Sequence, residues 1–144
     1  MFYADTSAVL PFYRSEPASD TIEQLYLAQR QPPVISELVR VEFASALARW
    51  VRMGELDEAQ ANRIESAFHE DVREGRFRLV SLDPSVFDRA MHWLLTHRTS
   101  LRTLDALHLA CAEASEAPLL TLDQALLASA EFFGVPTFSD LGPL

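Results

Sequence analysis

The 144-residue sequence contains no lysine, so all twelve of its basic side chains are arginines. Its one cysteine, Cys111, excludes an internal disulfide framework and disfavours a zinc site built on thiolates. Only four glycines, eight scattered prolines and no low-complexity stretch argue against disorder. No apolar run reaches the roughly 18 residues of a membrane span. The first twelve residues carry Asp5 and no basic stretch, unlike a signal peptide. We therefore expect a cytoplasmic globular protein with no membrane segment.

The formal net charge is −9. An acidic chain lacks the basic footprint that non-specific nucleic-acid binding needs. A function on nucleic acid would therefore require arginines gathered at one place, or acidic residues whose charge is neutralised by something bound to them.

Apolar strands and amphipathic helices alternate along the whole chain. Short strands are predicted at 1–5, 33–36, 77–82, 117–122 and 135–138. Helices are predicted at 7–12, 18–30, 36–54, 57–75, 83–97, 103–115 and 123–134. Ser36 and Asp57 are expected as helix N-caps, the latter in a capping box with Gln60. This alternation predicts an α/β fold with one domain over 1–144 and a mainly parallel sheet covered by helices.

Ligands of such sheets bind outside the carboxyl ends of the strands. Six acids follow a strand or open the next helix there: Asp5, Glu37, Glu42, Asp83, Asp105 and Asp123. Helix capping accounts for Asp83, which precedes Pro84, and the helix dipole accounts for Glu37 beside Ser36.

Glu42 has no such explanation, because it lies more than one turn inside its predicted helix. Its neighbours along the helix face, Leu38, Val39 and Ala46, form an apolar stripe. A carboxylate on a buried face costs several kcal/mol unless something pairs with it. We expect its partner to be either an arginine, such as Arg49, or a metal ion.

Asp5, Asp105 and Asp123 each also fit a capping or first-turn role. Asp5 and Asp123 nevertheless end strands that meet at one sheet edge, and Glu42 and Asp105 lie near the starts of helices that follow this edge. Four carboxylates about 5 Å apart would repel by roughly 3 kcal/mol per pair at an effective dielectric constant near 20. Such a cluster either takes up protons or binds divalent cations, and oxygen ligands suit Mg²⁺ or Mn²⁺. This pattern favours metal-assisted hydrolysis of a phosphodiester.

Four segments carry these acids: YADTSAVL, ELVRVEFASAL, LRTLDALHLACA and LLTLDQAL. Together, and in this order, they resemble the PIN-domain ribonucleases, and more narrowly the VapC-type toxins of bacterial toxin–antitoxin pairs. The resemblance covers the entire chain. It implies a single three-layer domain with a parallel sheet of four or five strands flanked by helices.

The resemblance implies that Asp5, Glu42, Asp105 and Asp123 form an acidic quartet that holds Mg²⁺, with Mn²⁺ as a substitute. It adds Thr6 or Ser7, and Thr121, as supporting hydroxyls. The implied activity is endonucleolytic cleavage of RNA by a metal-activated water, with Asp105 orienting this water or taking its proton. Arg102, one turn before Asp105, is the candidate phosphate contact.

The implied partners are RNA, a cognate antitoxin and a second copy of the chain. The helices at 18–30 and 36–54 have more apolar residues than one core contact needs. These residues would either belong to the core or supply surface for protein partners: Ile22, Leu25, Tyr26, Leu38, Val41, Phe43, Leu47 and Trp50. His108, on an apolar helix face, is expected to be a packing residue rather than a metal ligand, and Cys111 a buried small hydrophobe.

Other classes of function fit less well. A phosphotransferase of the haloacid dehalogenase type needs a second Asp two residues after the first, where this chain has Ser7. A receiver-type phosphoacceptor uses a lysine, which is absent. A non-catalytic PIN-like module that binds RNA or protein, and a PIN nuclease outside any toxin–antitoxin pair, stay open as alternatives.

Overall fold

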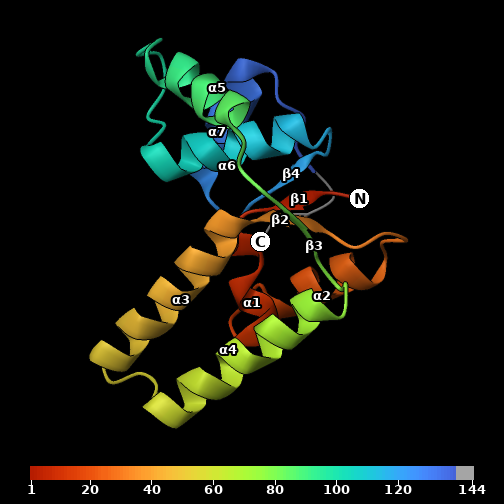
Figure 1. The fold of residues 1–144 in the computed structure, drawn as a ribbon, viewed down its shortest axis with the longest axis vertical. Coiled ribbons are helices and arrows are strands. Elements are labelled where there is room, and N and C mark those ends of the chain that lie inside the picture. Colours follow the sequence, from red (N-terminus) through yellow and green to blue (C-terminus); the bar gives the residue numbers. More distant parts are fainter. Residues whose placement is uncertain (139–144) are drawn as a thin grey trace.

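Four short parallel strands form the central sheet: β1 (Tyr3–Ala4), β2 (Val34–Ser36), β3 (Arg78–Val80) and β4 (Leu119–Leu120). They lie in the order β3-β2-β1-β4 (Figure 1). The structure is a computed structural model that describes residues 1–138. Tyr3 pairs with Leu119 and Ala4 with Leu120, so the residues that follow β1 and β4 emerge side by side at the carboxyl edge.

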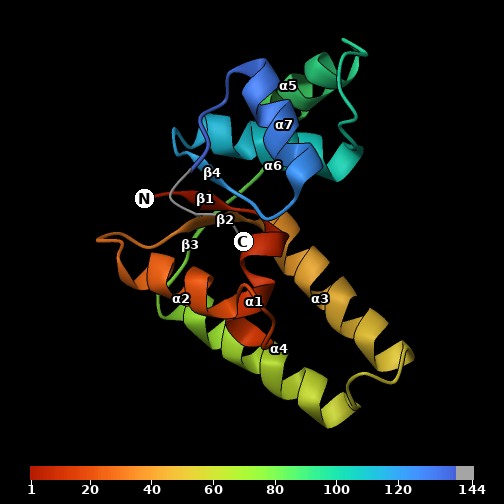
Figure 2. The same ribbon diagram turned by 180° about the vertical axis from the view of Figure 1, so that it is seen from behind.

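Helices cover both faces of the sheet. A 3₁₀ turn, η1 (Thr6–Ala8), follows β1, and on one side lie α1 (Leu10–Tyr13), α2 (Ser19–Leu27), α3 (Glu37–Arg52) and α4 (Glu58–Arg73). On the other side lie α5 (Pro84–Leu94), α6 (Thr103–Ala114) and α7 (Gln124–Phe133) (Figures 1 and 2). This is the predicted three-layer α/β architecture. Helices α3 and α4 form a long hairpin that extends away from the sheet.

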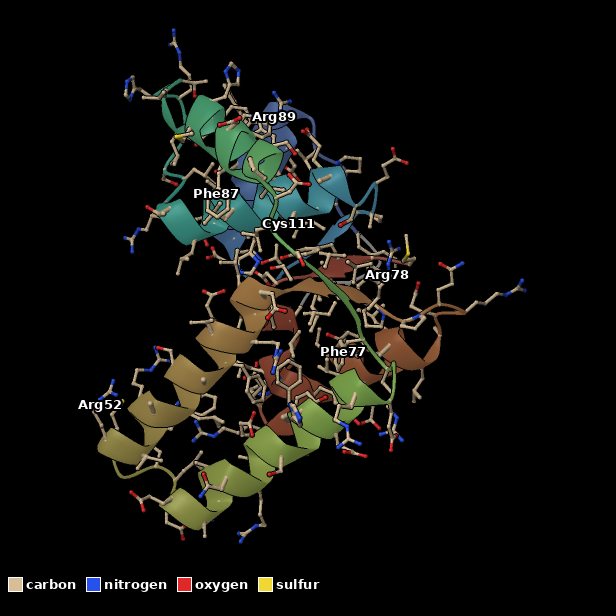
Figure 3. The ribbon with its side chains drawn as sticks, viewed as in Figure 1. Arg52, Phe77, Arg78, Phe87, Arg89 and Cys111 are labelled. Carbon is tan, nitrogen blue, oxygen red and sulfur yellow. The ribbon has the colours of Figure 1, made fainter. Side chains whose placement is uncertain are left out.

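The core has two halves, one on each face of the sheet. Tyr3, Val34 and Leu119 pack toward α5, α6 and α7, whereas their neighbours Ala4, Ile35 and Leu120 pack toward α1 to α4. Figure 3 labels one member of each half, Cys111 on α6 and Phe77 on the opposite side of the sheet. Because side chains of a strand alternate between two buried faces, the strands are continuously apolar in sequence.

Several predicted boundaries are wrong by a few residues. The helix expected at 18–30 ends at Leu27, ahead of Pro32 and Pro33, which disfavour helical backbone before them. The helix expected at 7–12 is divided into η1 and α1. The strand expected at 135–138 makes only a single parallel bridge, between Leu119 and Thr137, because Pro136 has no N–H to extend the ladder. The domain predicted over 1–144 includes 139–144, which lie outside the described residues.

The predicted helix caps are present, with one difference. Asp57 and Gln60 form the expected capping box of α4. Asp83 accepts hydrogen bonds from the Ser85 and Val86 amides at the start of α5. Ser36 occupies the N-cap position of α3, but its side chain makes no capping bond. Its hydroxyl is hydrogen-bonded instead to the hydroxyl of Tyr3.

The apolar residues expected to form partner surface are mostly core. Ile22, Phe43 and Leu47 are buried, and four others are partly buried against the core: Leu25, Tyr26, Leu38 and Trp50. Only Val41 is largely exposed, at 70%. Ile22, Phe43 and Leu47 are therefore core residues, as the alternative interpretation expected, and a role of the other five in partner contacts stays a prediction.

A row of exposed apolar side chains lies on α5 and its C-cap, where Phe87, Met91 and Leu95 follow one another at four-residue spacing. Leu27, at the end of α2, is also exposed. Among residues 1–138, no helix is both long enough and apolar enough to cross a membrane.

Candidate active site

Asp5 and Thr121 follow adjacent parallel strands, and the pairing of β1 with β4 brings their side chains into contact. Asp5 accepts hydrogen bonds from the Ser7 hydroxyl at 2.6 Å, the Thr121 hydroxyl at 2.7 Å and the Ala8 amide at 3.2 Å. Its Ala8 contact caps η1. Ser7 also accepts from the Leu122 amide at 2.9 Å, which ties the two strand ends together.

The Asp5 side chain is 5% exposed. Burial raises its pKa above the ordinary value for an aspartate, although the nearby His108 and the hydrogen bonds from Ser7, Thr121 and Ala8 oppose this rise. Burying this carboxylate costs desolvation free energy, and the hydrogen-bond donors around it offset part of that cost. A cation at its remaining lone pairs would oppose the rise further.

Glu42 is joined to the same region by two donors. Its Oε1 atom accepts a hydrogen bond from the Thr6 hydroxyl at 2.8 Å and another from Nε2 of His108. Burial alone would raise the pKa of Glu42, but the hydrogen bond and charge of His108, with the Thr6 bond, outweigh burial and hold it below its ordinary value. The expected need for a partner is thus met by His108 and Thr6, and the exposed Arg49 is not needed for it.

His108 is the partner of Glu42 that sequence reasoning did not identify. It is a buried residue, 2% exposed, as expected of a packing side chain. It also hydrogen-bonds Glu42 through Nε2 and the Tyr3 hydroxyl through Nδ1, the latter at 2.8 Å. The signal was present in the sequence, since Glu42 required a polar partner and His108 is the one basic residue on the apolar helix that begins beside Asp105.

Asp105 and Asp123 complete the acidic group. Asp105 lies in the first turn of α6, and Asp123 caps α7 by accepting from the amides of Ala125 and Leu126 at 2.9 and 3.2 Å. Burial raises the pKa of Asp105, and the negative charges of Asp123 and Glu42 raise it further, against the opposing charges of His108 and Arg102. The charges of Glu42 and Asp123 therefore reach Asp105, and the charge of His108 reaches Asp5, Glu42 and Asp105.

The other predicted residues divide between this edge and elsewhere. Thr6, Ser7 and Thr121 all hydrogen-bond an acid of the quartet, and Arg102 lies exposed at the N-cap of α6. Asp83 caps α5, as its sequence context indicates. Glu37 pairs with Arg40 at 3.6 Å within the first turn of α3.

The oxygens at this edge are arranged for a hydrated metal ion and not for an enclosed one. Within residues 1–138, no three side chains of His, Cys, Asp or Glu converge closely enough to enclose an ion directly. Mg²⁺ does not require such an enclosure, since it keeps several waters and binds through one or two carboxylates plus substrate phosphate. In the described part of the chain, Oε2 of Glu42 and both oxygens of Asp105 accept no hydrogen bond. These oxygens fit a hydrated Mg²⁺ or Mn²⁺.

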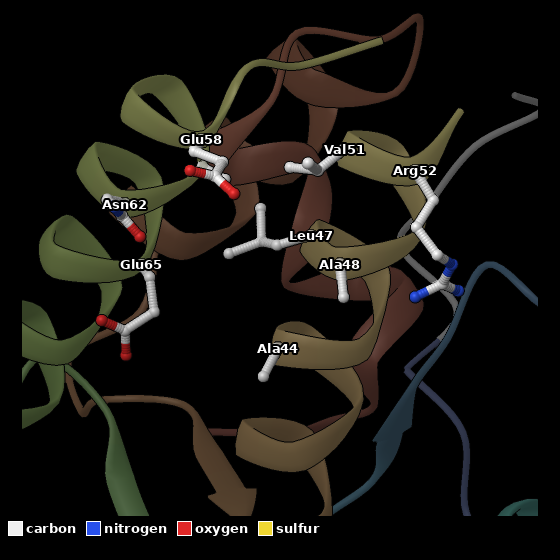
Figure 4. Close-up of a pocket in the computed structure, with 9 residues that line it drawn as sticks. Ala44, Leu47, Ala48, Val51, Arg52, Glu58, Asn62 and Glu65 are labelled. Carbon is white, nitrogen blue, oxygen red and sulfur yellow. The ribbon is translucent and has the colours of Figure 1, made fainter. Parts of the chain in front are cut away.

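A separate groove lies between α3 and α4, away from these acids (Figure 4). Its cavity volume is about 580 Å³, and Leu47 and Val51 form part of its apolar lining. Arg52 lies at one side and Glu58 and Glu65 at the other. The groove is thus amphipathic and contains none of the four acids.

The structure defines an α/β domain in which Asp5 and Asp123 follow parallel strands and Glu42 and Asp105 lie on helices. Comparison with known proteins identifies its family. The PIN domain model matches residues 2–131. Ribonuclease VapC46 of Mycobacterium tuberculosis is 34% identical over 113 residues, which span 77% of this chain and 73% of that protein. The chain belongs to the PIN domain family.

Solved structures share the fold at lower sequence identity. VapC20 of M. tuberculosis, described as a sarcin-ricin loop cleaving toxin, superposes with a TM-score of 0.70 at 16% identity over 90% of this chain and 95% of that one. FitAcB from Neisseria gonorrhoeae gives a TM-score of 0.71 at 17% identity over 99% and 100%. A toxin–antitoxin complex from Klebsiella pneumoniae gives 0.64 at 17% identity over 89% and 91%.

Proposed function

We propose that this PIN-domain protein is a Mg²⁺-dependent endoribonuclease that acts as the toxin of a toxin–antitoxin pair in the cytoplasm. The observation that supports this most directly is the position of the acids: Asp5 follows β1, and Asp105 lies where the charges of Asp123 and Glu42 act on it. The similarity to a ribonuclease of the VapC type over three quarters of the chain also supports a ribonuclease function.

The four acids would hold one or two Mg²⁺ ions through water and through their free oxygens. The ion would lower the pKa of a bound water and neutralise charge on the scissile phosphate. Asp105 is suited to orient the attacking water or accept its proton, since its pKa is raised by burial and by the charges of Asp123 and Glu42. Asp5 and Glu42, each tied down by donors, would serve as fixed ligands.

Arg102 would contact the RNA phosphate. Its charge lowers the pKa of Asp105, so it acts at the same edge of the sheet. It is exposed at the N-terminus of α6, where the helix dipole also favours an anion. The net charge of −9 would then not prevent RNA binding. Arg102 would supply positive charge at the site, and bound metal would neutralise part of the acidic excess.

The proposal includes an antitoxin partner and a homodimer. Two surfaces in the described chain suit protein contacts. The groove between α3 and α4 is apolar at its base with charged sides, which fits an amphipathic antitoxin segment. The stripe of Phe87, Met91 and Leu95 on α5, 47–70% exposed, fits a second copy. Figure 3 shows Phe87 on this helix.

The test is cleavage of RNA by the purified chain with Mg²⁺ or Mn²⁺, compared with Asp5→Asn. Asp83→Asn is the matched control, since Asp83 also follows a strand but only caps α5. We expect Asp5→Asn to lose cleavage at least 100-fold, the scale on which a lost catalytic ion costs rate, and Asp83→Asn to retain it. Equal cleavage by all three proteins would refute the assignment. No cleavage by the wild type would favour a non-catalytic RNA- or protein-binding module.

The toxin role has its own test. Expression should arrest growth, and co-expression of the small gene product encoded next to this one should restore it. Cleavage without growth arrest under any condition would indicate a PIN nuclease outside a toxin–antitoxin pair.

A further inference from the structure

A continuous series of hydrogen-bonded side chains runs from the core to the acidic edge. The Ser36 and Tyr3 hydroxyls are 2.8 Å apart, and the Tyr3 hydroxyl lies 2.8 Å from Nδ1 of His108. Nε2 of the same imidazole contacts Oε1 of Glu42, which also accepts from Thr6. These five side chains come from β1, β2, η1, α3 and α6. The series therefore connects Glu42 to four other elements of the fold, β1, β2, η1 and α6.

The chemistry of the groups fixes the direction of the contact with Glu42. An ionised carboxylate only accepts hydrogen bonds, so Nε2 of His108 carries the hydrogen and donates it. The imidazole is held at its other nitrogen by Tyr3, which is fully buried. His108 itself is 2% exposed, too buried to contact RNA or a metal-bound water directly. Its polar contacts are accounted for entirely by Tyr3 and Glu42.

Glu42 needs this support more than the three aspartates do. A glutamate side chain has one more rotatable bond than an aspartate, and the Glu42 side chain is 27% exposed, so a conformation extended into solvent is open to it. Both of its donors bind the same oxygen, Oε1. The other oxygen, Oε2, accepts no hydrogen bond from residues 1–138 and is left available.

We propose that His108 is a positioning residue, which anchors Oε1 of Glu42 so that Oε2 is presented to the metal ion. Tyr3 in turn fixes the ring orientation of His108. The inference rests on the proposed function, because it concerns how one of the proposed metal ligands is held. When a residue that hydrogen-bonds a metal ligand is removed, the site typically loses 10- to 100-fold in metal affinity or activity.

Two substitutions of His108 separate its two contacts. The side-chain amide of Gln reaches the region of Nε2, so His108→Gln keeps a donor for Glu42 while losing the contact with Tyr3. The shorter amide of Asn reaches only the region of Nδ1, so His108→Asn keeps a partner for Tyr3 and loses the donor for Glu42. Both remove the ring from the core, and Asn is smaller than Gln by one methylene group, so the stability of each variant has to be measured beside its metal affinity.

The measurement is Mn²⁺ affinity of the full chain by calorimetry, with urea unfolding of the same samples as the measure of stability. We expect His108→Asn to weaken Mn²⁺ binding about 10-fold or more and His108→Gln to stay within about 3-fold of the wild type. A purely structural role would instead lower the stability of both variants and leave Mn²⁺ affinity equal in the folded protein. Equal affinity in the two variants would overturn the inference.

A second measurement does not depend on metal or on the fold of the His108 variants. In metal-free wild type, the Nε2 hydrogen of His108 should exchange slowly enough with water to be observed by NMR, and Glu42→Ala should speed its exchange at least 10-fold. Equal exchange in the two proteins would also overturn the inference. Failure of the proposed function looks different, because Asp5→Asn would then bind Mn²⁺ as the wild type does, or neither would bind it.

Discussion

Replacing Tyr3 with phenylalanine removes one hydroxyl from the interior and leaves the ring in place. This hydroxyl bonds both Ser36 and His108 at 2.8 Å, and the side chain is fully buried. Each lost hydrogen bond costs about 1 kcal/mol, and a buried polar partner left unsatisfied costs about 1–3 kcal/mol. We therefore expect Tyr3→Phe to lower the free energy of unfolding by about 3 kcal/mol, or roughly 6–12 °C in melting temperature for a domain of this size.

Tyr26→Phe is the matched control, because the Tyr26 hydroxyl donates a single bond, to the carbonyl of Ala8, whereas the Tyr3 hydroxyl has two side-chain partners. It should lose only about 1 kcal/mol. The assay is equilibrium urea unfolding of the metal-free chain, in which a shift of the midpoint at constant slope reports stability. A Tyr3→Phe variant that loses no more than Tyr26→Phe would refute the view that Tyr3 anchors a buried polar network.

Three further predictions concern the acidic edge. The pKa of Asp105 is raised in the folded protein, so the protein loses stability as the pH rises from the unfolded-state pKa of this group through its folded-state pKa. Asp105→Asn removes this loss, so the variant should melt higher than the metal-free wild type, by a margin that grows from pH 4 to pH 7 in a calorimetric series. The same variant should not cleave RNA, because Asp105 is proposed to act on the attacking water. An equal or lower melting temperature at pH 7 would contradict this. Arg102→Gln should raise the KM for RNA about 3- to 10-fold and reduce the salt dependence of binding by about one phosphate contact, whereas Arg63→Gln, on the exposed surface of α4, should change neither. Chelation by EDTA should stop cleavage and Mn²⁺ should restore it, and cleavage that persists in EDTA would argue against a metal-dependent reaction.

The order of strands and helices was predictable from the sequence, because two-sided burial makes the strands continuously apolar and the helices carry clear caps. The capping box at Asp57 and the cap at Asp83 are local, since donor and acceptor are two or three residues apart. The strand at 135–138 was not predictable in the same way, because its apolar residues resemble a strand whether or not a neighbour supplies a full ladder of hydrogen bonds.

The partner of Glu42 was beyond local reasoning. The apolar stripe around Glu42 indicates correctly that it needs a partner, but His108 lies 66 residues away in sequence. An arginine two turns along the same helix was the partner that helical geometry suggested. Helices α3 and α6 lie on opposite faces of the sheet, and the fold brings His108 of α6 into contact with Glu42 instead. Periodicity shows which face of a helix is apolar, and only the packed fold shows what that face meets.

A carboxylate can cap a helix and bind a metal ion at the same time, because it has two oxygens and about four lone-pair positions. Asp123 caps α7 through Oδ1 alone. Asp5 caps η1 through Oδ1, which also accepts from Ser7, while Oδ2 accepts only from Thr121. Glu42 is anchored through Oε1 alone. In each case the bonds that hold the side chain in the fold leave at least one lone pair at the edge of the sheet. The same hydrogen bonds that fold the strand ends can therefore aim the remaining oxygens at a cation, so a helix cap at this edge is no argument against a metal ligand.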